Sequence, residues 1–180
     1  MTEQIICSGF GGQGVMSLGQ LLAYAGMLEN KEVSWLPSYG PEMRGGTANC
    51  SVIVSESLIG SPVITNDATC AIVMNKPSLI KFEKNILPGG KLLINSSLIE
   101  DKATRDDVEV YYVDANAIAA ECGTDKAANM VMLGAYLELT GVVSVDSVKQ
   151  AFLKVFGERK AHLLPLNELA LAKGAEAVRK

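Results

Sequence analysis

The sequence predicts an α/β fold, namely a Rossmann-like, mostly parallel sheet with helices on both faces and a helical C-terminal third. β-prone runs alternate with helix-periodic segments through the first two-thirds of the chain. A glycine cluster joins the first run to the first helical segment, and beyond Asp114 the β-patterning disappears. Because no repeat, low-complexity stretch or linker interrupts the pattern, we expect one domain over residues 1–180.

The strands are predicted from short apolar runs bounded by turn residues. The first, residues 5–7, is followed by glycines, and apolar side chains then recur at helical spacing over residues 15–28. Further strands are predicted at residues 33–36, 48–54, 71–74, 91–94 and 108–113. We expect Pro37 to end the second strand and Pro88-Gly89-Gly90 to break the chain before the fifth.

The C-terminal third is expected to consist of helices that cover a face or an edge of the sheet. They are predicted at residues 115–121, 127–139, 145–156 and 166–178. Gly141 and Gly157 fall where C-terminal caps belong. Earlier in the chain, Pro77 is expected in the first turn of a further helix, where its missing N–H costs nothing.

Composition excludes several classes of protein. With 48% hydrophobic and 20% charged residues, the chain can form a packed core and is not disordered. Because 16 Lys and Arg stand against 20 Asp and Glu, we expect no nucleic-acid partner. The N-terminus lacks the basic start of a signal peptide, and the most apolar later stretch, residues 127–137, is shorter than a membrane span. We therefore expect a cytoplasmic protein with no membrane partner.

Side chains for catalysis or metal binding are scarce. Cys7, Cys50, Cys70 and Cys122 are widely separated, with no C-x-x-C pair, so we expect no zinc or iron–sulfur site within this chain. Three of the four lie in strand-like runs, which predicts buried, reduced thiols. The single histidine, His162, has no second ligand at metal-binding spacing and is interpreted as a surface residue. We assign no catalytic residue and no metal ligand to the chain.

The glycine loop is the first candidate binding site. Gly9, Gly11 and Gly14 satisfy the G-x-G-x-x-G spacing between a strand and a helix, where backbone N–H groups and the helix N-terminus can bind an anion. The alternative is a tight turn that only packs the helix against the sheet. Free NAD binding is not favoured, because no carboxylate lies at the end of the second strand, and no Gly-Lys-Ser/Thr sequence closes a P-loop.

The loop at residues 37–46 is the second candidate site. Its large functional side chains are those of Tyr39, Glu42, Met43 and Arg44. It is expected to emerge beside the glycine loop, at the sheet edge where doubly wound folds bind ligands. Arg44 could make a bidentate contact with a carboxylate or phosphate. Alternatively, Arg44 contacts Glu42 or the backbone and merely holds the loop.

Together these segments resemble the gamma subunit, or gamma domain, of the 2-oxoacid:ferredoxin oxidoreductases. Gly-Phe-Gly-Gly-Gln-Gly-Val at residues 9–15 and Pro-Ser-Tyr-Gly-Pro-Glu-Met-Arg-Gly-Gly at residues 37–46 carry the resemblance. A third stretch at residues 129–134, Asn-Met-Val followed by Leu-Gly, agrees with it. The resemblance covers nearly the whole chain in order and length.

The resemblance implies a complex that oxidatively decarboxylates a 2-oxoacid to an acyl-CoA and passes the electrons to ferredoxin. It implies alpha and beta subunits with thiamine diphosphate and Mg²⁺, a ferredoxin-like delta subunit, and iron–sulfur clusters in cysteine-rich parts of the complex. No cofactor is expected on this chain alone, which would be inactive by itself. The 2-oxoacid is expected to be 2-oxoglutarate, 2-oxoisovalerate or pyruvate, with the first two slightly favoured, and an indolepyruvate type stays open.

The same resemblance implies roles for individual residues. The turn that would face a ligand or a partner comprises Gly9, Gly11, Gly12, Gln13 and Gly14. The neighbouring loop contributes Tyr39, Glu42, Met43 and Arg44. We hypothesise that both face the alpha subunit near the arriving coenzyme A, with the helix N-terminus and Arg44 available for its phosphates. The alternatives are a stand-alone nucleotide- or coenzyme-binding protein and a small NAD(P)-dependent reductase.

Overall fold

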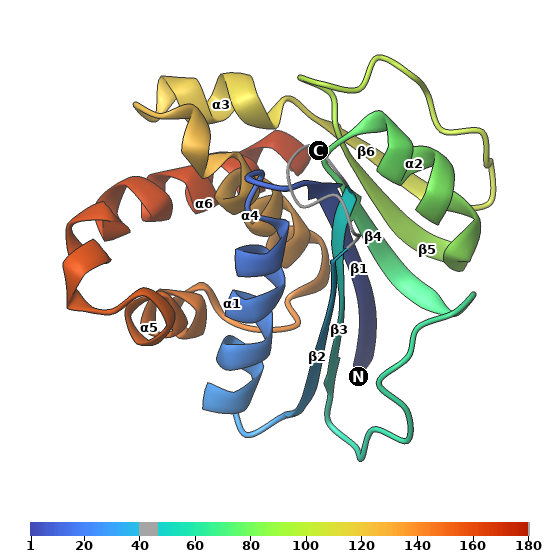
Figure 1. Cartoon of the computed structure of the whole chain (residues 1–180), viewed down its shortest axis with the longest axis horizontal. Coiled ribbons are helices and arrows are strands. Elements are labelled where there is room, and N and C mark those ends of the chain that lie inside the picture. Colours follow the sequence, from blue (N-terminus) through green and yellow to red (C-terminus); the bar gives the residue numbers. More distant parts are fainter. Residues whose placement is uncertain (40–46, 180) are drawn as a thin grey trace.

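The computed structural model describes residues 1–39 and 47–179, and within them six strands form one sheet in the order β2-β3-β1-β4-β5-β6 (Figure 1). The strands are β1 (Thr2–Phe10), β2 (Glu32–Tyr39), β3 (Thr47–Ser55), β4 (Ala68–Val73), β5 (Ile86–Asn95) and β6 (Glu109–Val113). The helices are α1 (Val15–Leu28), α2 (Lys76–Phe82), α3 (Ala115–Glu121), α4 (Ala128–Thr140), α5 (Val145–Phe156) and α6 (Leu164–Val178). Two short 3₁₀ segments, η2 (Asp125–Ala127) and η3 (Glu158–Leu163), precede α4 and α6.

The sheet is mostly parallel, as predicted. β1, β4, β5 and β6 pair in parallel, whereas β3 lies antiparallel to both of its neighbours, β1 and β2. A purely doubly wound order would place β2 beside β1. Here β3 lies between them, so that β2 becomes an edge strand.

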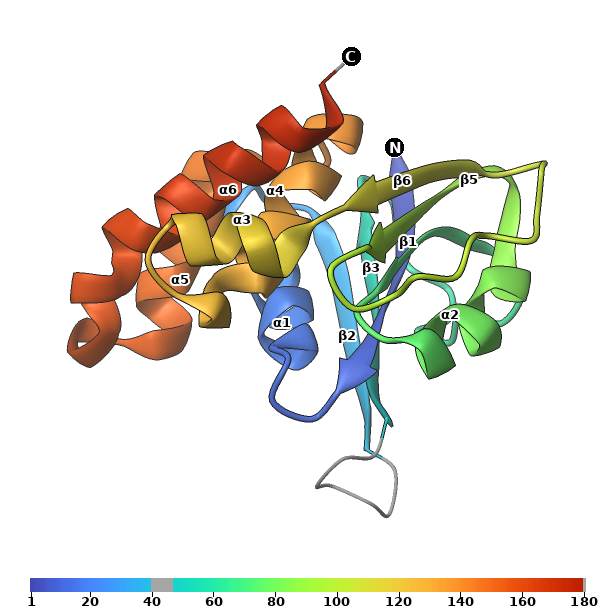
Figure 2. The same ribbon diagram turned by 90° about the horizontal axis from the view of Figure 1, so that it is seen from above.

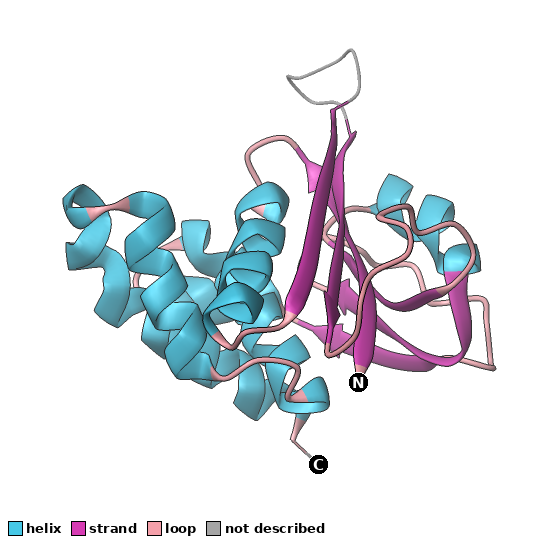
Figure 3. Cartoon of the chain, turned by 90° about the horizontal axis from the view of Figure 1, so that it is seen from below, coloured by secondary structure: helices cyan, strands magenta, loops and turns pink. Residues whose placement is uncertain are grey.

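Helices cover both faces of the sheet, but unequally. α1, α4, α5 and α6 gather over one face and α2 lies over the other (Figures 2 and 3). Alternation along β1 places Ile5 and Cys7 in the larger core cluster, beneath the four helices, and Ile6 in the smaller one beneath α2. None of the helices in the described ranges combines the length and apolarity needed to cross a membrane.

The predicted end of the second strand is wrong. β2 continues through Pro37 to Tyr39. Because β2 pairs only with β3, it has a free edge, and a residue without a backbone N–H is tolerated there. Pro37 therefore lies within the strand, opposite Cys50.

The predicted chain break before the fifth strand is also wrong. Pro88-Gly89-Gly90 lies inside β5, which begins at Ile86. The pairing with β4 shifts register across these residues, and Gly89 has φ +77°. The tripeptide thus forms an irregularity within a strand, as bulges do, rather than a break. The predicted helices agree closely with the structure, except that α6 begins at Leu164 rather than at residue 166.

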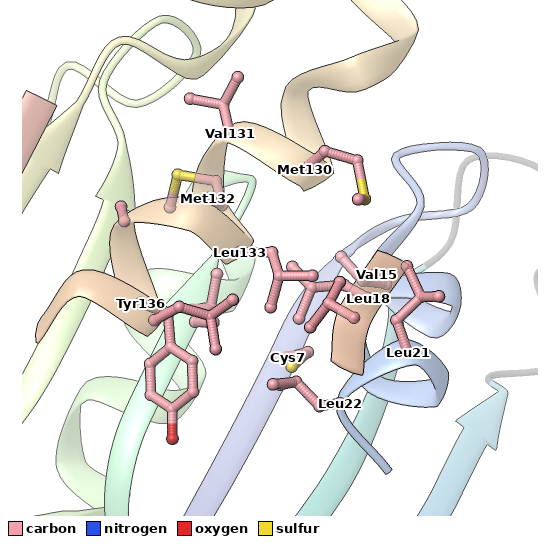
Figure 4. Packing of buried hydrophobic residues seen from close by; sticks show 14 of the residues in the cluster. Cys7, Val15, Leu18, Leu21, Leu22, Met130, Val131, Met132, Leu133 and Tyr136 are labelled. Carbon is pink, nitrogen blue, oxygen red and sulfur yellow. The ribbon is translucent and has the colours of Figure 1, made fainter. Parts of the chain in front are cut away.

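α4 is the central helix of the larger core. All its residues from Ala128 to Leu137 are buried, and Leu133 and Tyr136 point into the cluster that contains Cys7 (Figure 4). α4 also contacts α6 backbone to backbone. A Cβ atom on Gly134 would lie 2.0 Å from the Leu171 carbonyl oxygen, and one on Gly174 would lie 1.9 Å from the Val131 carbonyl oxygen. No side chain fits at either position, so two glycines set the distance between the helices.

We predict that Gly134→Ala lowers the free energy of unfolding by about 2 kcal/mol or more, because the new methyl group must displace a helix backbone. Alanine favours helices over glycine by only about 1 kcal/mol, which does not offset that displacement. Urea denaturation measures the change. Gly60→Ala is the control, since a Cβ at Gly60 meets no atom within 4 Å. A Gly134→Ala protein as stable as the unsubstituted chain would show that the helices can separate freely.

Candidate functional site

The candidate site lies at the carboxyl ends of the parallel strands. β1 leads into α1 on one face of the sheet, and β4 leads into α2 on the other (Figure 2). The sheet edge between these two strands is therefore the topological switch point, where open α/β sheets bind ligands. The glycine loop, which runs from Gly9 near the end of β1 to Gly14 before α1, lies at this point.

The end of β2 and the start of β3 lie at the same edge of the sheet. Phe10 at the end of β1 pairs with Thr47, and Ala48 pairs with Tyr39. The predicted neighbourhood of the two loops is thus supported by the strand ends that flank them. Three of the predicted loop residues, Glu42, Met43 and Arg44, lie outside the described residues.

Glycine is required in this loop for two different reasons. A Cβ on Gly9 would lie 2.8 Å from the Met74 Cβ, and one on Gly14 would lie 2.5 Å from the Asn129 Nδ2. Gly12 and Gly14 also have positive φ angles, +94° and +76°, which side chains disfavour. These glycines make a tight turn with its backbone close to two other segments of the chain.

Gln13 holds this turn in place. Its Oε1 accepts a hydrogen bond from the Phe10 N–H at 2.6 Å, and its Nε2 donates to the Met74 carbonyl oxygen at 3.1 Å. The side chain therefore ties the loop to the end of β4. Gln13 was predicted to face a ligand or a partner; within this chain its amide positions the loop.

Asn129 joins the loop to α4. Its Nδ2 donates to the Gly14 carbonyl oxygen at 3.2 Å, across 115 residues of sequence. The bond brings the N-terminus of α4 beside the N-terminus of α1. Neither helix has a side-chain N-cap or an acidic residue in its first turn. The first turn of α1 therefore keeps N–H groups without a partner among the described residues, whereas α4 continues η2, and its Met130 N–H donates to the Asn129 Oδ1 at 3.0 Å. The N-terminus of α1 is thus the end that can hold an anion.

A cleft adjoins the loop on the side of the sheet. This edge cleft has a volume of about 170 Å³. It is lined by Gly12, Gln13, Met74, Asn116, Asp125, Lys126 and Ala128. Asn116 is held there because its Oδ1 accepts a hydrogen bond from the Asn95 Nδ2 at 2.8 Å. Lys126, in the short η2 segment, brings a cation to the edge cleft.

The sequence predictions missed Met74, Asn116 and Lys126. Two of them could have been found from the strand pattern, since Met74 follows β4 and Asn116 follows β6. Residues that follow parallel strands meet at the same edge of the sheet. Lys126 follows no strand, so its position depends on where α4 packs. No local pattern carries that information.

Buried polar groups lie directly beneath the loop. The Ser8 and Ser78 hydroxyl oxygens are 2.7 Å apart, and the Asn75 Oδ1 accepts a hydrogen bond from the Ser78 N–H at 2.9 Å. These contacts join the end of β1 to the start of α2. The serine before the glycine turn is therefore tied to the start of α2.

The cysteines lie where strand patterning predicted them. Cys7, Cys50 and Cys70 are buried in adjacent strands, and Cys7 pairs directly with Cys50 across β1 and β3. The contact between these two thiols, together with burial, raises the pKa of Cys7 well above its ordinary value. Burial likewise raises the pKa of Cys70. Among the described residues, no group of three or more His, Cys, Asp or Glu side chains is arranged to hold a metal ion.

Comparison with known proteins gives a consistent result. A family model described as "Pyruvate ferredoxin/flavodoxin oxidoreductase" matches residues 4–177. The ketoisovalerate oxidoreductase subunit VorA of Methanothermobacter marburgensis is 37% identical over 175 residues, which are 96% of this chain but 36% of VorA. The chain thus spans about a third of that relative's length. The 2-oxoglutarate synthase subunit KorC of Methanocaldococcus jannaschii is 35% identical, with 100% of this chain and 96% of KorC covered.

Solved structures agree with these relatives. The gamma subunit of a keto/oxoacid ferredoxin oxidoreductase from Geobacter sulfurreducens superposes with a TM-score of 0.81 at 29% identity, covering 97% of both chains. A 2-oxoglutarate:ferredoxin oxidoreductase from Magnetococcus marinus, solved with 2-oxoglutarate, coenzyme A and succinyl-CoA bound, gives a TM-score of 0.88 at 25% identity. That match covers 99% of this chain and 32% of the other.

We predict that Gln13→Ala destabilises the chain by about 1 kcal/mol, because the exposed Phe10 N–H and the Met74 carbonyl oxygen each lose a hydrogen-bond partner. Gln20→Ala on α1 is the matched control, since Gln20 lies outside the loop. Urea denaturation gives the stability, and hydrogen exchange of the Phe10 amide reports loop opening directly. Equal stability and exchange in the two variants would remove the positioning role of Gln13.

Proposed function

The chain belongs to the pyruvate ferredoxin/flavodoxin oxidoreductase family, and from that membership we propose that it is the gamma subunit of a 2-oxoacid:ferredoxin oxidoreductase. The complex oxidatively decarboxylates a 2-oxoacid, forms an acyl-CoA and transfers the electrons to ferredoxin. One observation carries the proposal, namely the match with KorC over the full length of both chains. The longer VorA chain supports it, since it contains a match to this chain as one part of a larger polypeptide.

The cofactors of this reaction fit poorly on the chain itself. An iron–sulfur cluster takes cysteine thiolates as ligands. Cys7, Cys50 and Cys70 are instead packed in the core as free thiols, two of them with raised pKa. We therefore assign the clusters, thiamine diphosphate and Mg²⁺ to alpha, beta and ferredoxin-like delta subunits. A cytoplasmic location belongs to the proposal, because reducing compartments keep such thiols reduced.

The glycine loop is the part of this chain that we assign to coenzyme A. The N-terminus of α1, which begins after Gly14 and has no side-chain cap, suits the charge of its phosphates. Arg44 is proposed as a further phosphate ligand, while Tyr39, Glu42 and Met43 are proposed to face the alpha subunit. The Magnetococcus marinus relative, which was solved with coenzyme A bound, supports this assignment by analogy.

The identity of the 2-oxoacid belongs to the partner subunits in this proposal. Relatives of similar identity carry the names of ketoisovalerate and 2-oxoglutarate enzymes. One gamma fold thus accompanies different substrates. We propose 2-oxoglutarate or 2-oxoisovalerate as the substrate of this complex.

We predict that the chain co-purifies under anaerobic conditions with thiamine diphosphate- and cluster-containing subunits. Activity with coenzyme A and ferredoxin, measured over a panel of 2-oxoacids, then appears only in the assembled complex. A monodisperse isolated chain that turns over a substrate with NAD(P)H would overturn the proposal.

We predict that Arg44→Ala in the reassembled complex raises the KM for coenzyme A about tenfold, because a charged hydrogen-bond partner of a phosphate is lost. The KM for the 2-oxoacid stays unchanged. Arg159→Ala, on an exposed arginine, is the matched control. An unchanged KM for coenzyme A, with assembly intact by gel filtration, removes the anion role of Arg44 without affecting the subunit assignment.

A further inference from the structure

A groove lies in the helical layer at the end of the domain away from the glycine loop. This C-terminal groove has a volume of about 590 Å³, and the second half of α4, the start of α5 and α6 line it. Its floor is aliphatic and nearly buried, with exposures of 6% for Leu137, 3% for Val143 and 2% for Leu171. Val145, at the start of α5, also lines the groove and is 45% exposed. An apolar depression rimmed by polar groups is typical of a protein interaction site.

Hydrogen bonds hold the walls of the C-terminal groove in place. The Ser144 N–H donates to the Glu29 Oε1 at 2.7 Å, and the Lys31 Nζ donates to the Val142 carbonyl oxygen. Both bonds tie the connection between α4 and α5 to the end of α1. The opposite wall is α6, whose backbone contacts α4 at Gly134. Because these walls are fixed before a partner enters, binding costs little further ordering of this chain.

The rim of the groove is acidic. Its described charged groups are the carboxylates of Glu29, Glu138 and Glu168 and one guanidinium, that of Arg179. Arg179 pairs with Glu138, its Nε lying 2.8 Å from the Glu138 Oε1. Lys31 and Lys149 pair with the other two carboxylates and are not among the residues that line the groove. An apolar segment that carries Lys or Arg at its borders therefore complements this rim.

The positions of the termini indicate which partner reaches this groove. Arg179, the last described residue, lines it, and the N-terminus lies on the same side of the domain, away from the glycine loop (Figures 2 and 3). VorA extends far beyond its match with this chain, and the match covers nearly all of the chain. The rest of VorA is therefore joined to the matched part at a counterpart of one of the two termini. In that longer relative, the remaining polypeptide begins on the side of the groove.

We propose that the C-terminal groove docks a segment of a catalytic partner subunit, alpha or beta. Aliphatic side chains of the segment pack on Leu137, Val143 and Leu171, and its Lys or Arg side chains lie beside the acidic rim. The separate subunit thus holds by noncovalent contacts, on this side, the polypeptide that longer relatives carry covalently. The inference rests on the proposed function, because only a subunit of a complex has such a partner. It places an assembly contact opposite the glycine loop.

Val145 offers the variant that tests the proposal. We expect Val145→Glu to weaken binding of the subunit to the rest of its complex at least about tenfold, measured as a Kd by biolayer interferometry, because a charge enters an apolar contact. A carboxylate in the first turn of α5 is compatible with the helix. Val145→Leu keeps an apolar side chain and keeps the affinity. Ile80→Glu is the matched control, since Ile80 is 67% exposed on α2, over the other face of the sheet (Figure 2).

Photocrosslinking in the assembled complex identifies the occupant of the groove. With p-benzoylphenylalanine in place of Val145, we expect a covalent adduct with the alpha or beta subunit, identified by mass spectrometry. An adduct between two copies of this chain, no adduct, or an unchanged Kd for Val145→Glu would each overturn the inference and leave the proposed function standing. If the unsubstituted chain forms no complex at all, both are overturned. Unfolding midpoints of the variants exclude misfolding as the cause.

Discussion

The contact between α4 and α6 is the constraint on which the candidate site depends. Gly134 and Gly174 let the two helix backbones touch, and this depth of packing fixes the position of α4 along its axis. Asn129, in the first turn of α4, is thereby held against Gly14. The N-termini of α4 and α1 thus meet because of an interhelical contact more than one helical turn away from them. The edge of the sheet that carries the candidate site is therefore positioned by a backbone contact within the helical layer.

The sequence predicted elements well where the information is local. The strand, glycine turn and helix at residues 5–28 and the four later helices were predicted from the apolar residues within each segment. α4 was recognisable as a long apolar run, since it is buried on all sides from Ala128 to Leu137. The failures at Pro37 and at Pro88-Gly89-Gly90 have one cause. Proline and glycine are tolerated at a free edge or an irregularity of a sheet, and strand order cannot be read from local pattern.

The candidate site was predictable in part. The spacing of Gly9 and Gly14 predicted the turn. The structure explains why both residues are glycines, because a Cβ atom at either position would clash with another segment of the chain. The hydrogen bond by which Gln13 holds the loop to the end of β4 could not be predicted from the sequence. Its acceptor, the Met74 carbonyl oxygen, is 61 residues away. Lys126 appears in the sequence as an ordinary surface lysine. Only the packing of α4 places it beside the glycine loop.

The antiparallel β3 has a consequence for how such a protein can change. Tyr39 pairs with Ala48, so the chain between β2 and β3 leaves and re-enters the sheet on adjacent strands. A connection of that kind can gain or lose residues without altering any crossover or the order of the other strands. The length of the chain between these two strands can therefore change while the order and pairing of the six strands stay the same.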